Sequence, residues 1–120
     1  MKCKTDKIDA LDKINFWGNE LEDVSIIWSM PNLQIISLSV NKIWSLEDFA
    51  FCPWLKELYL RKNAISDIWE VGYLRNCPNL EVLWLRENPI EHHWLYWFFV
   101  IKCLPNLKKL DDYEVTYEEK

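Results

Sequence analysis

A chain of 120 residues, half of them hydrophobic, is long enough to bury a core and fits a single domain. Its formal net charge of -5 argues against direct binding of nucleic acid, because a phosphate backbone attracts clustered Lys and Arg. Residues 1–11 contain no apolar core of a signal peptide, and the longest apolar run, residues 94–101, is much shorter than the roughly 20 residues that span a bilayer. These features predict a protein of the cytosol or nucleus with no membrane span.

A phrase of the form L-x-x-L-x-L-x-x-N-x-L, in which L stands for Leu, Ile or Phe, occurs four times. The copies begin at Leu11, Leu33, Leu55 and Leu80, and a partial fifth copy begins at Leu107. A phrase that recurs at such a period is the signature of a leucine-rich repeat. It predicts an α/β fold: a right-handed solenoid with a parallel β-sheet on its concave face and 3₁₀ or α-helical segments on its convex face.

The whole chain, residues 1–120, is predicted to form one leucine-rich-repeat domain. Its four repeats start near residues 11, 33, 55 and 80, and residues 105–120 form a C-terminal cap. Thr116 and Glu119 have the spacing of a capping box that opens a helix, only one turn before Lys120. We therefore expect the natural protein to continue beyond the last residue of this chain.

Each phrase closes on an asparagine, and these residues are predicted to form a structural ladder: Asn19, Asn41, Asn63 and Asn88. A carboxamide offers an acceptor and two donors, so each asparagine can pair with its own turn and with the next one. Asp would offer acceptors alone. Loss of one ladder side chain is therefore expected to cost roughly 1–3 kcal/mol for each backbone group left unpaired.

The return segments between strands differ in length. The first two are short, and irregular or 3₁₀ turns are as compatible with them as α-helix. In the third, Asp67 and Glu70 have capping-box spacing, which predicts a helix that runs to about Leu74. The fourth, residues 91–104, has room for about three helical turns.

Five stretches carry a more specific resemblance: residues 16–19, 37–41, 57–63, 82–89 and 104–111. The Trp17-Gly18 pair and the Leu-Ser-Val-Asn phrase that ends at Asn41 are their most specific parts. Together the stretches resemble the N-terminal repeat domain of a family of cilia- and flagella-associated proteins found at basal bodies, over nearly the whole chain. Four tryptophans stand where that family carries smaller or polar residues: Trp28, Trp44, Trp54 and Trp69.

This resemblance implies a non-enzymatic role in cilium formation, a NIMA-related protein kinase as partner and a link to the DNA damage response. It implies a cytoplasmic location at the cytoskeleton of the basal body, with the nucleus as an alternative. It also implies a separate C-terminal helical oligomerisation segment, which this chain lacks. We therefore expect a monomer or weak self-association.

Side chains alternate along a strand, so the residues between the inward leucines are expected to face the concave side. The candidate partner-binding residues on that face are Trp17, Ser39, Tyr59, Arg61, Trp84 and Arg86. Trp, Tyr and Arg dominate binding hot spots because they combine a large rigid area with a polar group. The alternative is that neighbouring aromatic rings stack along the sheet for stability alone.

A second candidate interface lies in the apolar run at residues 94–101. If Tyr96, Val100 and Leu104 face the core, then the apolar side chains that point outward are Leu95, Phe98 and Phe99. An exposed apolar patch marks a partner or self-association site, and burial under the terminal cap is the alternative.

No constellation for catalysis or for a cofactor is predicted. His92 and His93 are adjacent and do not share a helix face, which makes them a poor metal pair. Two glycines, Gly18 and Gly72, are too few for a phosphate loop. The leading function, as the resemblance implies, is a protein-interaction scaffold of the basal body. The rivals are a nuclear or spliceosomal repeat protein that holds an RNA-binding partner and a regulatory subunit of a phosphatase.

Overall fold

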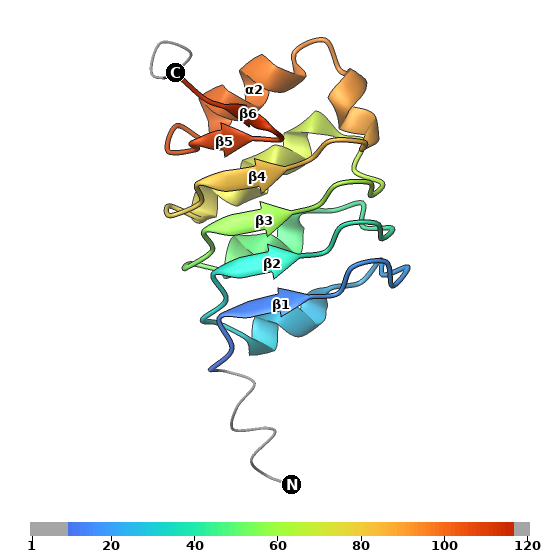
Figure 1. Cartoon of the computed structure of the whole chain (residues 1–120), viewed down its shortest axis with the longest axis vertical. Helices are drawn as coiled ribbons and strands as arrows, with labels where there is room; N and C mark the ends of the chain where they lie inside the picture. Colours follow the sequence, from blue (N-terminus) through green and yellow to red (C-terminus); the bar gives the residue numbers. More distant parts are fainter. Residues whose placement is uncertain (1–9, 117–120) are drawn as a thin grey trace, which may run out of the picture.

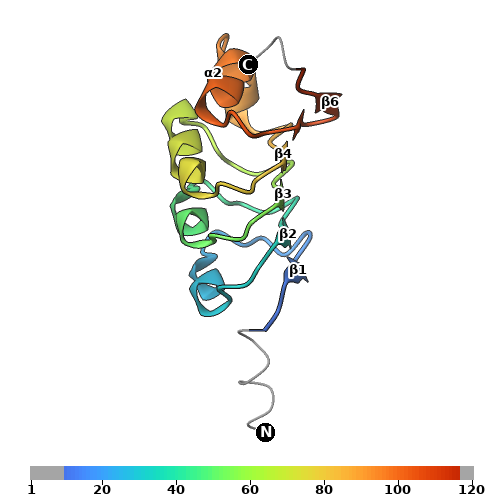
Figure 2. The ribbon, with the colours of Figure 1, turned by 90° about the vertical axis from the view of Figure 1, so that its left-hand side faces the viewer.

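The computed structural model describes residues 10–116 of the chain. Strands and helical return segments alternate, and the strands are stacked one above another (Figure 1). From the side, the strands lie in one layer and the return segments in a second layer behind it (Figure 2). The chain is therefore a two-layer solenoid, as the repeated phrase predicts, with its core between the layers.

Six strands form a single sheet whose order follows the chain. They are β1 (Lys13–Asn15), β2 (Ile35–Ser37), β3 (Glu57–Tyr59), β4 (Val82–Trp84), β5 (Lys109–Leu110) and β6 (Tyr113–Glu114). The first five are parallel, and β6 runs antiparallel to β5. The register aligns equivalent positions of the phrase, so that the central inward residues form one row: Ile14, Ile36, Leu58, Leu83 and Leu110.

The return segments are mostly 3₁₀ helices. They are η1 (Ser25–Ser29), η2 (Glu47–Phe51), η3 (Ile68–Asn76) and η4 (Pro89–His92), followed by the α-helix α2 (Tyr96–Cys103). The first two thus take the 3₁₀ form that the sequence allowed.

The helix predicted for the third return segment is present, begins after Asp67 as expected and ends at Asn76, two residues beyond Leu74. η3 is a 3₁₀ helix, and the Asp67 carboxylate accepts a hydrogen bond from the backbone N–H of Trp69. The Glu70 carboxylate instead accepts hydrogen bonds from the Ser45 hydroxyl, at 3.0 Å, and from the Leu46 N–H, at 2.7 Å. Glu70 therefore links two repeats where the capping-box pattern predicted a local contact.

The fourth return segment, which has room for about three helical turns, is divided between two helices. η4 ends at His92 and α2 begins at Tyr96. Between them the backbone N–H of Leu95 donates to Nδ1 of His93 at 3.0 Å, which stabilises a turn. α2 is 8 residues long and so makes about two turns.

The inward aliphatic positions form one continuous core. In the second to fourth repeats the leucine and isoleucine positions of the phrase are buried: Leu33, Ile36, Leu38, Leu55, Leu58, Leu60, Leu80, Leu83 and Leu85. Each such side chain contributes about 1.5–3 kcal/mol by leaving water. Leu11 and Phe16 of the first repeat stay exposed, because the described part of the chain has no repeat before β1.

The residue before each ladder asparagine has a left-handed backbone. Its φ is 67° at Gly18, 60° at Val40, 59° at Lys62 and 66° at Glu87. This conformation costs an L-residue roughly 1–2 kcal/mol and is least suited to a β-branched side chain. The glycine of the first repeat meets the requirement without strain, and Val40 is the most strained of the four.

Val40→Asn is expected to raise the free energy of unfolding by about 1 kcal/mol, because Asn tolerates the left-handed region. Urea denaturation measures the change. Lys62→Asn is the matched control and should gain less, since Lys is not β-branched. A loss of stability in Val40→Asn would show that the valine side chain contributes more by packing than its backbone costs.

Candidate protein-binding surface

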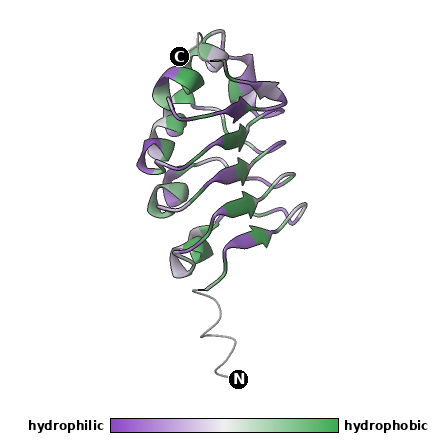
Figure 3. Ribbon diagram, turned by 60° about the vertical axis from the view of Figure 1, so that its left-hand side comes forward, coloured by the Kyte–Doolittle hydropathy of each residue, from purple (hydrophilic) through white to green (hydrophobic). Residues whose placement is uncertain are grey.

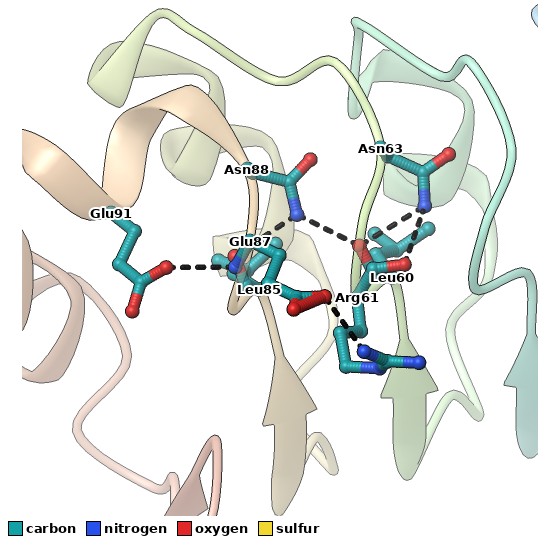
Figure 4. Close-up of polar contacts among 7 residues, drawn as sticks. All are labelled: Leu60, Arg61, Asn63, Leu85, Glu87, Asn88 and Glu91. Atoms are coloured by element: carbon teal, nitrogen blue, oxygen red, sulfur yellow. Dashed lines mark hydrogen bonds and ion pairs between the residues drawn. The ribbon is translucent and has the colours of Figure 1, made fainter.

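The asparagine ladder sets the spacing of the strands that carry the candidate surface. The Asn88 amide donates to the carbonyl oxygens of Leu60, at 2.8 Å, and Leu85, at 2.9 Å (Figure 4). Its Oδ1 accepts from the Ile65 N–H at 3.1 Å. Asn63 repeats this arrangement one unit earlier, with Leu38, Leu60 and Ile43 as partners. Each asparagine therefore holds its own turn to a neighbouring one.

The predicted partners of the ladder need one correction. They were expected in the same turn and the next one, but they lie in the same turn and the preceding one. Asn41 shows this clearly, because its Oδ1 accepts from the N–H groups of Asn19 and Leu21 in the first repeat. Asn19 itself has no described repeat before it, and its amide donates to the carbonyl oxygen of Trp17.

Side chains close the opposite end of the ladder. In earlier repeats, the residue after each strand donates its N–H to the next strand: Phe16 to Ser37, Leu38 to Tyr59, and Leu60 to Trp84. The equivalent N–H of Leu85 donates at 2.7 Å to Oδ1 of Asp111, and the Glu87 N–H donates at 2.8 Å to the Glu91 carboxylate. These carboxylates take the place of the carbonyl groups of a further repeat.

Asp111 is buried and has a second donor. The Tyr96 hydroxyl donates to its Oδ2 at 2.8 Å. Burial raises the pKa of the Asp111 carboxyl, while the hydrogen bonds from Leu85 and Tyr96 act in the opposite direction. Burial, followed by the charge of Asp111, also raises the pKa of the Tyr96 phenol, which therefore remains a donor.

The sheet face that points away from the return segments, called the concave face below, carries the predicted binding residues. Tyr59 ends β3 and Trp84 ends β4, directly opposite each other in the register. Both are partly exposed, and Trp17 is 59 % exposed. Ser39, however, is only 9 % exposed and offers a partner little area.

Both arginines of the concave face are held by carboxylates of the following repeat. Arg61 pairs with Glu87 at 2.7 Å (Figure 4), and Arg86 pairs with Asp112 at 2.8 Å. The Arg86 guanidinium also lies 5.6 Å from the centre of the Tyr113 ring. These contacts limit the rotamers of both arginines, so less conformational entropy is lost when a partner binds.

Tyr59 is also held in place. Its hydroxyl donates to the Glu57 carboxylate at 2.6 Å. Burial, and then this hydrogen bond, raises the pKa of Tyr59 to about 12, so the phenol is protonated at neutral pH. The concave face thus presents at least one preorganised aromatic ring, that of Tyr59, whose hydroxyl has a fixed partner.

The second candidate interface is only partly as predicted. Tyr96, Val100 and Leu104 are buried, and Phe98 is exposed. Leu95 and Phe99 are half-buried instead of pointing freely outward. The Phe99 ring packs edge-on against Trp69 with 5.2 Å between the ring centres, so it is partly covered by η3.

The buried thiols have the environment of structural residues. Burial raises the pKa of Cys52 to about 11 and that of Cys77 to about 12, so both are protonated at neutral pH. Within residues 10–116 no three His, Cys, Asp or Glu side chains are grouped to hold a metal ion. Among these same residues, no helix has the length and apolar character needed to cross a membrane.

A protein-family model described as leucine-rich repeat matches residues 4–120. The chain belongs to the leucine-rich repeat family. It is 44 % identical over 121 residues to cilia- and flagella-associated protein 410 of Mus musculus, and 44 % identical over 122 residues to the Homo sapiens protein of the same name. These matches cover 98 % of this chain but 48 % and 47 % of those proteins, so the chain spans about half the length of the curated relatives it matches.

The predicted resemblance to cilia- and flagella-associated proteins is therefore confirmed. Among solved structures, one of the Drosophila melanogaster SNF/U2A' complex is similar to this leucine-rich repeat domain with a TM-score of 0.83. That match covers 94 % of this chain and 66 % of the other, at 23 % identity. At this identity the match shows the shared fold alone.

Sequence reasoning missed three carboxylates that accept hydrogen bonds from backbone groups. Glu70 and Asp111 join neighbouring repeats, and Glu91 acts within its own repeat. The donors of these hydrogen bonds are backbone N–H groups, which no residue type marks in a sequence. One signal was present for Asp111. The phrase breaks there, because Asp112 stands where the phrase requires its third aliphatic residue.

Proposed function

We propose that this domain is a non-enzymatic protein-interaction module of the cilium that binds its partner on the concave face. Tyr59 and Trp84 carry the proposal, because they lie side by side on β3 and β4 and remain partly exposed although the core beneath them is closed. Aromatic side chains held in this way are typical of binding hot spots.

The similarity to cilia- and flagella-associated protein 410 supports the cilium as the place of action. We propose a basal-body location and a NIMA-related protein kinase as the partner, as the resemblance of the repeat phrases implies. Within this proposal, Trp17, Arg61 and Arg86 extend the contact around the two central rings. Basal-body localisation would distinguish this function from the nuclear and phosphatase alternatives.

Affinity capture from ciliated cells tests the proposal. Tyr59→Ala combined with Trp84→Ala is expected to reduce capture of the partner at least tenfold, because loss of a hot spot costs about 2 kcal/mol or more. The melting temperature should stay within a few degrees of the wild type, since both side chains are partly exposed and lie outside the closed core. Quantitative mass spectrometry of the captured proteins, with the kinase among those measured, provides the readout.

Trp54→Ala is the matched control, because Trp54 is an exposed aromatic residue in the turn before β3 and not on the concave face. It should leave capture unchanged. Undiminished capture by the double variant would exclude the concave face as the binding surface. Unfolding of the double variant would show that the two rings act in stability instead.

A further inference from the structure

The two ends of the solenoid differ in how their cores are covered. The C-terminal end is closed by α2, by the β5–β6 hairpin and by the carboxylates of Asp111 and Glu91. At the N-terminal end, β1 pairs with β2 on one side and with no described strand on the other. Hydrophobic residues of β1 and η1 lie at this open end (Figure 3).

An apolar cavity of about 380 Å³ opens between β1 and η1. Its walls are largely aliphatic and aromatic and include Ile14, Phe16, Leu21, Val24, Ile26 and Ile27. Ile26 is 57 % exposed at its rim, although it belongs to a type that is usually buried. The cavity therefore offers apolar surface that an apolar side chain from another molecule can cover.

Carboxylates lie at one side of this opening. Asp23 lines the apolar cavity and also a neighbouring one of about 350 Å³, whose walls include Glu22, Glu47, Asp48 and the exposed Trp44. Asp23 accepts a hydrogen bond from the Ser25 N–H.

The excess negative charge of the domain is concentrated in this region. Residues 11–52 contain six carboxylates and two lysines: Asp12, Glu20, Glu22, Asp23, Glu47 and Asp48 against Lys13 and Lys42. Lys42 already pairs with Glu20 at 3.2 Å. Residues 53–116 are nearly balanced, with nine carboxylates and eight Lys or Arg. A partner for the open end must therefore combine apolar and basic groups.

We propose that the open N-terminal end of the solenoid is a docking site for a basic amphipathic helix of a partner protein, separate from the concave face. The apolar side of the helix covers Ile26 and enters the cavity, and its Lys or Arg side chains pair with Asp23 and the carboxylates of the neighbouring cavity. A helix laid into an apolar groove is a common recognition mode, and complementary charge speeds association and selects the partner. A second copy of this domain fits poorly, because its own carboxylates would meet those of the first.

A labelled model peptide tests the site without knowledge of the natural partner. The probe is a 14-residue helical peptide of leucine and lysine with all leucines on one face, and the control peptide carries glutamate in place of lysine. Fluorescence anisotropy with the full chain is expected to give at least tenfold tighter binding of the lysine peptide. Equal binding of the two peptides would overturn the proposal.

Matched substitutions locate the binding. Ile26→Asp and Glu22→Lys should each weaken binding of the lysine peptide about tenfold. Phe98→Asp and Glu114→Lys should change it less than twofold, because Phe98 is equally exposed, at 57 %, and both residues lie near the C-terminal end. If these controls weaken binding as much, the peptide is responding to general charge and apolarity, and the proposal is wrong.

Two further outcomes would assign the open end to another occupant and so also overturn the proposal. One is a dimer of the wild-type chain, detected by sedimentation, that is absent in Ile26→Asp. The other is at least tenfold tighter peptide binding after Lys7→Glu with Ile8→Asp, which would show that residues 1–9 compete for the site. Tyr59→Ala with Trp84→Ala should leave peptide binding unchanged, so this test and that of the concave face can fail separately.

Discussion

Asn88→Ala is expected to lower the free energy of unfolding by about 3 kcal/mol. The Asn88 side chain is 1 % exposed, so water cannot replace the hydrogen bonds that it makes. The Ile65 N–H loses its acceptor and is left buried without a partner. The Leu60 and Leu85 carbonyl oxygens lose one donor each but keep another, from the Asn63 amide and from the N–H of residue 88. The single orphaned donor therefore accounts for most of the loss.

Asn19→Ala is the matched control, because it removes the same group from the exposed first position of the ladder. The amide of Asn19 donates to the carbonyl oxygen of Trp17 in its own turn. The expected loss is below about 0.5 kcal/mol, as for other exposed substitutions. Urea denaturation with an unchanged m value measures both variants. Equal losses would show that the asparagine acts within its own turn and that the links between repeats contribute little.

The repeated phrase was sufficient to predict the sheet, its parallel order and the inward residues of the second to fourth repeats. Those features follow from side-chain alternation, which is a local property of each strand. The same alternation correctly placed Tyr59 and Trp84 on adjacent strands. Burial of Ser39 was not predictable in this way, because exposure depends on the side chains of neighbouring strands.

The return segments were harder to predict for a physical reason. Each must return the chain to a position one strand spacing away, about 4.8 Å along the stack, and that constraint acts between repeats. Glu70 illustrates this, since its spacing from Asp67 satisfies a local rule while its carboxylate bonds Leu46, 24 residues earlier. The ion pairs of Arg61 and Arg86 likewise join residues 26 positions apart. Such contacts become visible only when the repeats are stacked.

Asp111→Ala is expected to lower the free energy of unfolding by about 3 kcal/mol, because it leaves two donors without acceptors. These are the Leu85 N–H and the Tyr96 hydroxyl, and both residues are buried. Asp112→Ala is the matched control. Asp112 is exposed and pairs with Arg86, so its removal should cost less than about 1 kcal/mol.

Tyr96→Phe separates the two functions of the Asp111 carboxylate. It removes the donor to Oδ2 and leaves the bond from Leu85 in place. Because the two residues contact each other, the losses in Asp111→Ala and Tyr96→Phe should not add, and the double variant should be more stable than their sum predicts. Chemical denaturation of the four proteins gives the coupling, and strictly additive losses would contradict it.

Closure of the C-terminal end by Asp111 also bears on partner binding. Asp111 accepts a hydrogen bond from the N–H of Leu85, which stands between Trp84 and Arg86 in the chain. Trp84 and Arg86 are the two concave-face residues of the fourth repeat. Without this acceptor, the end of β4 is no longer held in one position. A partner that binds there must first reorder the surface, and the free-energy cost of this reordering lowers its affinity. Asp111→Ala should therefore weaken partner capture at a temperature where the protein is still folded. Asn19→Ala, at the far end of the ladder, should leave capture unchanged. If Asn19→Ala and Asp111→Ala weaken capture equally, closure of the C-terminal end has no specific effect on binding.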